Sequence, residues 1–299
     1  MSAYSAVVKA GSKKRKQLYW LLWIIGMSAV SAVLFTPLVA MLTTAFKSME
    51  EIQTSMALFP RVWHPENFVD AMSAGDWPRY FMNTAIVTVS SVALAMLFNS
   101  IAGFAFARLN FPGKNIMFMS MLIGLMMPAQ VTLLPTFMII VNFPFAGGND
   151  LFGQGGTGLM NTYAGLILPL ISSSFGVFLS RQYFMNFPTS LDEAAEIDGC
   201  NKFQTYFKIY LPISKPLLAT LGVLRAVNSW NDYIWPLVVT NRVSMRTVQL
   251  GLTKYSTEFG TDWNLLMAAT TLVVLPMVLL FLFAQKYFVE GIANAGIKG

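Results

Sequence analysis

The sequence predicts an all-α integral membrane protein with six transmembrane helices. Of its 299 residues, 55% are hydrophobic and only 11% are charged, whereas soluble domains carry about 25% charged residues. Six segments have the roughly 20 predominantly apolar residues that a helix needs to cross about 30 Å of hydrocarbon. The Lys and Arg residues between these segments are distributed unevenly, which predicts an orientation.

The first predicted span, 18–46, follows a basic N-terminal tail, 1–17, and precedes an extracytoplasmic loop, 47–76. Its apolar run is far longer than the roughly 7–15 residues of a signal-peptide core, so we interpret it as a retained helix. The other predicted spans are 81–107, 115–142, 161–181, 216–240 and 265–288, followed by a cytoplasmic tail, 289–299.

Several spans contain prolines, which are expected to kink the helices because each removes a backbone donor. Packing irregularity and a gating hinge are both compatible with such kinks. The prolines in question are Pro37, Pro128, Pro135, Pro169 and Pro276.

Charge asymmetry predicts that both termini are cytoplasmic. With the N-terminus inside, the inside segments and the span ends beside them hold thirteen Lys and Arg residues and the outside loops hold six, as expected when cytoplasmic loops are enriched in positive charge. Topology therefore explains the net charge of +6, and no nucleic-acid partner is required.

Composition also excludes most sites with their own chemistry. The chain has one histidine, His64, and one cysteine, Cys200, and it lacks the phosphate-binding GxxxxGK[ST] and the metal-binding HExxH motifs. We therefore expect no catalytic residue, no metal and no cofactor held by this chain.

The most informative segment is the polar stretch 187–215 between two apolar runs. Ser190 and Glu193 have capping-box spacing, which predicts a short helix, 191–198, that Gly199 ends. We expect the pair Ala194-Ala195 to present a smooth surface that another protein can approach. Phe203, Tyr206, Phe207 and Tyr210 then fall on one face of a second helix, which Leu211-Pro212 is expected to end.

The spacing Glu193-Ala-Ala, three residues, Gly199, nine residues, Ile209-x-Leu211-Pro212 resembles the signature loop of permease subunits from binding-protein-dependent ABC importers. The resemblance extends from about residue 77 to the C-terminus. Trp230-Asn-Asp-Tyr-Ile-Trp-Pro236 and the tail from Phe288 are similar to the carbohydrate branch, in particular to the smaller six-helix permease of the maltose type.

This resemblance implies a type I ABC importer permease fold for 77–288, in a multi-pass protein of the bacterial cytoplasmic membrane. It implies a second homologous permease, two copies of a cytoplasmic ATPase that uses ATP and Mg, and an extracytoplasmic sugar-binding protein as partners. It also implies that the loop couples ATPase closure to alternating access, with Glu193 on the ATPase and Gly199 at the turn. The implied coupling residues are Glu193, Ala194, Ala195, Asp198, Gly199, Ile209, Leu211 and Pro212.

Two features depart from the family pattern. The glycine-rich stretch 145–158 is longer than usual; it reads as a flexible or turn-rich loop, compatible with an external contact or a tolerated insertion. Arg225 lies inside the fifth span, where an ionised group is costly. Together with Asn228 and Asp232 on the same expected helix, it could line a translocation path, pair with the partner permease, or snorkel to the interface.

Two other classes of function compete with the permease reading. A stand-alone secondary transporter or channel usually carries ion-binding carboxylates within its spans, and Asp232 is the one acidic residue in a predicted span. An intramembrane enzyme needs a nucleophile with a base or a metal cluster, and the chain supplies neither pattern.

Overall fold

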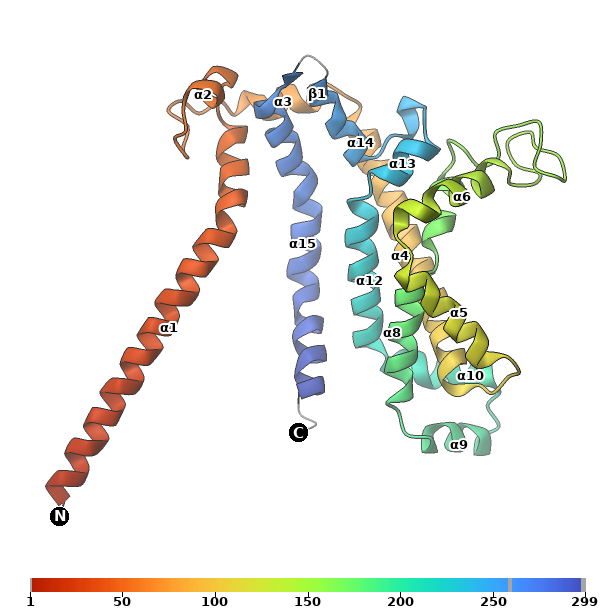
Figure 1. The fold of residues 1–299 in the computed structure, drawn as a ribbon, viewed down its shortest axis with the longest axis horizontal. Helices are drawn as coiled ribbons and strands as arrows, with labels where there is room; N and C mark the ends of the chain where they lie inside the picture. Colours follow the sequence, from red (N-terminus) through yellow and green to blue (C-terminus); the bar gives the residue numbers. More distant parts are fainter. Residues whose placement is uncertain (1, 258–259, 297–299) are drawn as a thin grey trace. The chain divides into compact units, whose positions relative to one another are not determined.

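The computed structural model describes the backbone of residues 2–257 and 260–296 and the side chains of residues 16, 19–257 and 260–285. The chain divides into two compact units, Met1–Ala74 with Tyr255–Leu272, and Gly75–Lys254 with Val273–Gly299. Most of the described backbone is helical (Figure 1).

The first unit joins three helices, a two-stranded ribbon and the start of the last helix. Strand β1 pairs with β2 in antiparallel register, Ser256 opposite Thr261. The elements are α1 (Ser2–Ala45), α2 (Met49–Thr54), α3 (Glu66–Ser73), β1 (Ser256–Thr257), β2 (Gly260–Thr261) and α15 (Trp263–Gly296).

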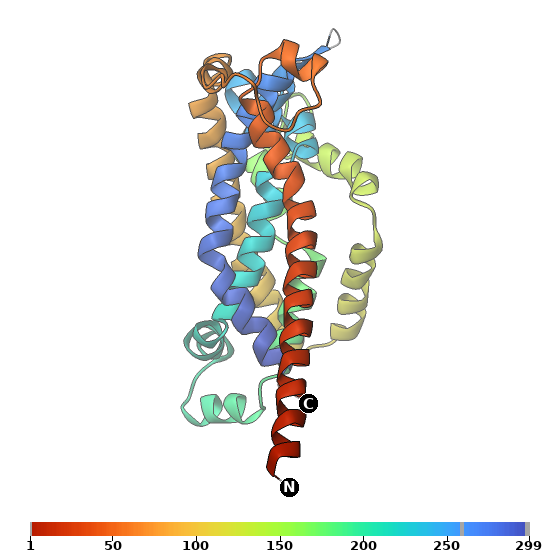
Figure 2. The same cartoon turned by 90° about the vertical axis from the view of Figure 1, so that its left-hand side faces the viewer.

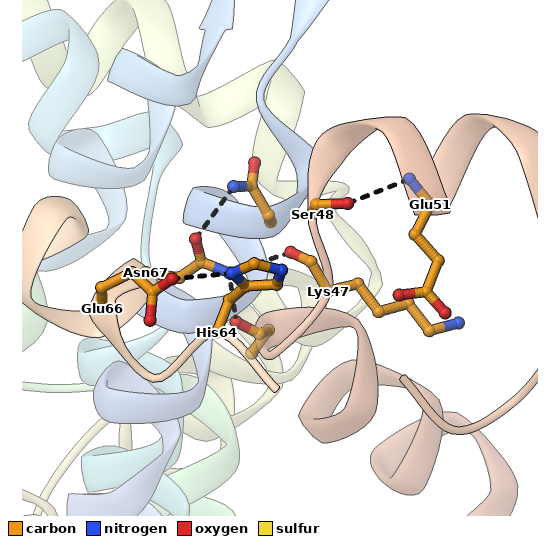
Figure 3. A network of polar contacts seen from close by, with 8 residues as sticks. Lys47, Ser48, Glu51, His64, Glu66 and Asn67 are labelled. Carbon is orange, nitrogen blue, oxygen red and sulfur yellow. Dashed lines mark hydrogen bonds and ion pairs between the residues drawn. The ribbon is translucent and has the colours of Figure 1, made fainter. Parts of the chain in front are cut away.

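A buried amide, Asn67, ties the elements of the first unit together (Figure 3). Its Nδ2 donates to the carbonyl oxygens of Ala45 and Lys47, each at 2.9 Å, and its Oδ1 accepts from Asn264 Nδ2 at 3.1 Å. The end of α1, α3 and the start of α15 therefore share one side chain. Because a buried amide needs partners for its polar atoms, this position requires asparagine.

The second unit contains the remaining elements. They are α4 (Trp77–Arg108), α5 (Lys114–Met126), α6 (Ala129–Val141), α7 (Tyr163–Ile167), the 3-10 turn η1 (Leu168–Leu170), α8 (Ser174–Met185), α9 (Ser190–Ile197), α10 (Lys202–Thr205), the π turn η2 (Tyr206–Tyr210), α11 (Leu211–Ile213), α12 (Lys215–Trp230), α13 (Ile234–Val239), the 3-10 turn η3 (Val243–Met245), α14 (Val248–Leu252), the 3-10 turn η4 (Thr253–Tyr255) and the rest of α15.

Helix α4 is the central helix of the second unit, with α8 and α12 packed along it (Figure 2). The approach of α8 is close: a Cβ at Gly103 would lie 2.2 Å from Ser180 Cβ. On the α12 side, Ser229 Oγ accepts hydrogen bonds from Thr88 at 3.3 Å and Ser91 at 3.2 Å. Small and hydroxyl residues allow this packing because they bring helix backbones together and satisfy polar groups without water.

Among the described residues, three helical segments are long and apolar enough to cross a membrane: Tyr19–Ala45, Trp77–Arg108 and Trp263–Gln285. The number rises to as many as six if each of three bent helix pairs counts as one span. The six predicted spans thus remain a prediction. The bent pairs are α5 with α6 (111°), α7 and η1 with α8 (44°), and α10–α11 with α12 (80°).

Three predicted spans are wrong as continuous helices. The segment 161–181 is divided between η1, which ends at Leu170, and α8, which begins at Ser174. The segment 115–142 is divided between α5 and α6, with Pro128 at the start of α6 in an extended conformation, because proline lacks the N–H that would continue the ladder. The segment 216–240 is divided as well: α12 ends at Trp230 and α13 begins at Ile234. Of the other prolines, Pro37, Pro135 and Pro276 lie inside helices, and Pro169 lies in η1.

The stretch 145–158 is an organised loop built from turns, which agrees with the turn-rich interpretation of its glycines. Asn149 Nδ2 donates to the carbonyl oxygens of Val141 and Phe143, and its Oδ1 accepts from the Gly156 backbone at 2.8 Å. Five of its glycines have positive φ, a backbone conformation that glycine adopts without the steric cost that other residues incur.

The close approach of α4 and α8 predicts that Gly103→Ala destabilises the protein. The added methyl would meet Ser180 and the Arg181 backbone nitrogen, 2.8 Å away, and overpacking of this kind costs about 1–3 kcal/mol. Thermal unfolding in detergent measures the effect. Gly222→Ala is the matched control, because there the nearest atom is the flexible Met96 Sδ at 3.1 Å. Equal melting temperatures for the two variants would contradict the prediction.

A second glycine pair tests the organised loop. Gly153→Ala should disorder the loop, because φ is +75° and a Cβ would lie 2.0 Å from the Asn142 carbonyl oxygen. Gly155→Ala, with φ +96° and its nearest atom at 3.8 Å, should cost only the backbone strain of about 1–2 kcal/mol. Limited proteolysis between 145 and 158 compares them, with faster cleavage expected for Gly153→Ala; similar rates would count against the loop geometry.

Candidate functional site

Helix α9, Ser190–Ile197, is the short helix that the polar stretch predicts, and it lies beyond the ends of α4, α8 and α12 (Figures 1 and 2). The predicted capping box is wrong. Thr189 occupies the N-cap with helical φ and ψ (−64°, −24°) and no side-chain hydrogen bond, because a capping side chain reaches the first N–H groups from an extended backbone. The Thr189 carbonyl accepts from Asp192 and Glu193 instead.

Gly199 ends α9 as expected, in a left-handed conformation with φ +72°. The Gly199 N–H donates to the Glu196 carbonyl at 3.0 Å and the Cys200 N–H donates to the Ala195 carbonyl at 2.9 Å. This pair of bonds is a Schellman motif, which satisfies the last carbonyl groups of a helix. The turn after α9 is therefore held by backbone geometry.

Three side chains attach α9 to the end of α4, and we call Arg108, Asp192 and Tyr210 the loop anchor. Arg108 Nη1 lies 3.3 Å from Asp192 Oδ2, and Tyr210 donates to Asp192 Oδ1 at 2.9 Å. The Arg108 side chain is 9% exposed and that of Asp192 is 24% exposed. Arg108 also donates to the Phe187 carbonyl. Both ions of the pair are thus largely withdrawn from water and joined by charge-assisted contacts, while the buried Arg108 Nε has no hydrogen-bond partner among the described residues.

Tyr210 stays protonated, and so remains a hydrogen-bond donor, at neutral pH. It lies outside the predicted spans, in the return of the loop, where burial raises the pKa of its hydroxyl; the hydrogen bond to Asp192 raises it further and the charge of Arg108 opposes these effects. Because the pKa is above the unfolded value of about 10, the neutral form stabilises the fold below that pH. This contribution is lost as the pH rises through the folded-state pKa.

Only half of the predicted aromatic stripe is buried. Tyr206 and Tyr210 are 2% and 0% exposed and pack against the rings of Phe104 and Phe184, whereas Phe203 and Phe207 are exposed. The reason is the π turn Tyr206–Tyr210, in which the Leu211 N–H donates to the Tyr206 carbonyl five residues back. Wider turns of this kind change the periodicity that a regular helix would have.

The face of α9 directed to solvent differs from the predicted alanine surface. Ala195 is fully buried and Ala194 is exposed, so the pair does not present a common face. Glu193, Ile197 and Asp198 are exposed as well. Glu196 pairs with Lys202 across the Gly199 turn.

The predicted residues at the end of the loop lie where the chain returns to the helices. Ile209 and Leu211 are half-buried against a cluster of aromatic and leucine side chains that we call the aromatic cluster: Phe104, Phe184, Tyr206, Tyr210, Leu217 and Leu221. Pro212 is exposed within α11. The expected stop at Leu211-Pro212 is wrong: α11 extends to Ile213, and the 80° bend into α12 follows at Ser214. Pro212 fits here because the first turn of a helix leaves its N–H unused.

Arg225, Asn228 and Asp232 do not share one helix face as expected. Arg225 and Asn228 lie on α12, but Asp232 follows its end and accepts the Trp235 N–H at 3.2 Å. No hydrogen bond or ion pair joins Arg225 to another described residue. An apolar cavity of about 710 Å³ between α4, α12 and α15 is lined by none of the three.

Sequence reasoning missed the loop anchor. Neither Asp192 nor Arg108 is among the coupling residues predicted from the sequence. The four-residue spacing of Tyr206 and Tyr210 was a usable signal for one buried face. The pairing of Arg108 with Asp192, 84 positions apart in the sequence, had no local signal. No group of three His, Cys, Asp or Glu that could hold a metal occurs among the described side chains.

The anchor predicts that Asp192→Asn releases α9. The amide leaves the largely buried Arg108 without its counter-charge, which should cost about 2 kcal/mol and raise amide hydrogen exchange in 190–201 by more than tenfold. Asp198→Asn is the control, because Asp198 is exposed at the C-cap of the same helix and its side chain forms no hydrogen bond or ion pair with a described residue. Unchanged amide hydrogen exchange in Asp192→Asn would contradict the role of the loop anchor in holding α9.

Comparisons with known proteins agree with this architecture. Residues 99–294 match the family model described as "Binding-protein-dependent transport system inner membrane component". The chain is 36% identical over 286 residues to a probable ABC transporter permease, YurM, of Bacillus subtilis, covering 93% of this chain and 90% of the relative. It is 34% identical to the arabinooligosaccharides transport system permease AraQ of Halalkalibacterium halodurans, covering 94% and 97%.

A solved structure of a bacterial ABC transporter that imports the acidic polysaccharide alginate contains a chain of the same fold, with a TM-score of 0.76 at 19% identity, over 91% of this chain and 97% of that one. The family match covers well over half of the chain. The chain therefore belongs to the inner membrane components of binding-protein-dependent ABC transport systems.

Proposed function

We propose that the chain is a permease subunit of an ATP-driven importer for a sugar or oligosaccharide, and that α9 couples a partner ATPase to the membrane helices. The observation that carries the proposal is an exposed short helix, closed by a Schellman turn at Gly199 and attached to α4 by the loop anchor. The names of relatives support the substrate class. Relatives are named as permeases of transport systems for arabinooligosaccharides, sn-glycerol-3-phosphate and starch degradation products.

The proposed assembly follows from the family and from charge. Six spans, with both termini in the cytoplasm of a bacterium, would place α9 on the cytoplasmic side, within reach of one of two ATPase copies that use ATP and Mg. A second permease would complete the membrane part, and an extracytoplasmic sugar-binding protein would deliver the substrate. A structure similar to this chain contains a periplasmic protein with bound alginate pentasaccharide, at a TM-score of 0.62 and 13% identity.

The anchor supports transmission of force. A displacement of α9 acts on Asp192, which contacts Arg108 at the last turn of α4 and Tyr210 in the aromatic cluster. Because that cluster includes residues of α4, α8 and α12, packed side chains join α9 to three helices at once. Close-packed interiors transmit strain because they have low compressibility.

The coupling residues fall into two groups, those that are exposed and those that are buried or half-buried. Glu193, Ala194 and Asp198 would contact the ATPase, since they are exposed, while Ala195, Ile209 and Leu211 would hold the loop. Gly199 would set the turn and Pro212 the return into the membrane.

Arg225, Asn228 and Asp232 are proposed contributors to the translocation path. Arg225 makes no ion pair among the described residues and Asn228 is exposed, as expected for groups that face a polar solute or the second permease. Asp232 stands at the break between α12 and α13, and broken helices in membranes commonly border cavities.

Glu193→Gln tests the coupling in the assembled transporter, reconstituted in proteoliposomes with its ATPase, second permease and binding protein. ATP-driven uptake should fall on the order of tenfold, because a charged contact across a buried interface is lost, while hydrogen exchange in α9 stays unchanged. Glu50→Gln is the matched control, since Glu50 is exposed on α2 and its side chain has no partner among the described residues.

Gly199→Pro complements this test, because proline removes the N–H that donates to Glu196 and cannot adopt φ +72°. Full ATP-dependent uptake by this variant would overturn the coupling role. Uptake by the chain alone under an ion gradient would instead support a stand-alone transporter.

A further inference from the structure

A cavity of about 600 Å³ lies where α4 turns into α5, against the end of α8. Two cationic side chains, Lys114 and Arg181, and two amides, Asn110 and Asn115, line it. None of its lining residues is acidic. The cavity is separate from the loop anchor and from the residues proposed for translocation.

Both cations have donors left over. Lys114 Nζ donates to the Leu109 carbonyl at 2.7 Å, and Arg181 Nε donates to the Phe106 carbonyl at 3.3 Å. The Arg181 guanidinium also lies 4.1 Å from the centre of the Phe118 ring. A lysine has three donors and an arginine five, and neither side chain forms an ion pair with a described carboxylate. Burial and the neighbouring Arg181 lower the pKa of Lys114, which an anion between the two cations would reverse.

The backbone at this place also favours an anion. Helix α5 starts at Lys114 after Gly113, which has φ +78°. No side chain caps its 13 residues and no acidic residue lies in its first turn. The partial positive charge of the helix dipole at the start of α5 therefore adds to the charge of Lys114.

The surface beside the cavity is apolar. Ile116, Met117 and Met119, in the first two turns of α5, are 74%, 56% and 65% exposed, and Met185 at the cavity rim is 51% exposed. In a protein of this membrane family, such a surface suits acyl chains. Lys114 and these apolar residues of α5 follow one another within two turns of helix, with Arg181 of α8 across the cavity, as the headgroup and tails follow one another in a phospholipid.

We propose that this basic cavity binds the phosphate of an anionic phospholipid, with the acyl chains along α5. Lys114 and Arg181 hold the phosphate oxygens, Asn110 and Asn115 donate to the rest of the headgroup, and the methionines and Ile116 contact the tails. A free phosphate uses the same cations but gains nothing from the apolar flank. An acidic segment of a partner protein would compete for the same groups, and the lipid is favoured because the cations adjoin exposed apolar side chains.

The test uses the assembled transporter in nanodiscs that contain photoactivatable phosphatidylglycerol or phosphatidylcholine with identical acyl chains. Mass spectrometry maps the adducts. Phosphatidylglycerol should label residues 114–119 on the order of tenfold more than phosphatidylcholine, since two cations act on one phosphate. The preference should disappear in Lys114→Gln/Arg181→Gln and persist in Lys114→Arg/Arg181→Lys.

Arg61→Gln/Lys254→Gln is the control for net charge, because both side chains are exposed and far along the chain from α5. Lys114→Gln alone, at the half-buried first residue of α5, gives a second measurement if the double variant folds poorly; it should lose part of the preference. Equal labelling by the two lipids would overturn the proposal. So would displacement of phosphatidylglycerol by inorganic phosphate, which indicates a free-anion site, or a cross-link from 114–119 to an acidic partner segment in place of lipid.

Discussion

The packing of α4 against α8 and α12 is the constraint on which the second unit depends. At Gly103 the two backbones of α4 and α8 approach so closely that no side chain fits between them. Where α4 meets α12, the hydroxyl groups of Thr88 and Ser91 donate to Ser229. In a membrane the hydrophobic effect does not drive helices together, so small residues and hydroxyl contacts carry this role.

The C-terminal end of α4 serves two different surfaces. Its last residue, Arg108, pairs with Asp192 and so holds α9. The turn that follows carries Lys114 into the basic cavity beside Arg181. Motion of α4 relative to α8 would therefore affect the loop and the proposed lipid site together. A phospholipid bound there would stabilise one arrangement of the two helices, in proportion to its difference in affinity between the arrangements.

The predictions from sequence were sound wherever a local signal sufficed. The left-handed turn at Gly199 and the short helix before it follow from glycine's conformational freedom and from the polar break. The capping box, the exposed alanine pair and the uniform aromatic stripe were wrong. Each assumed a regular helix with one free face, whereas Thr189 is already helical, Ala195 packs inward, and the second helix is interrupted by a π turn and leaves Phe203 and Phe207 exposed.

The sequence by itself determined the class of the protein, the apolar segments and the place of the polar loop, because hydrophobic content, charge placement and Gly199 act locally along the chain. Only the tertiary structure decided that Asp192 holds the loop while Glu193 is free to meet a partner. It also decided that Asp232 leaves the helix of Arg225, and that Lys114 and Arg181 border one cavity. These facts join residues far apart in sequence, and such pairs are selected by burial, charge and geometry that no local pattern encodes.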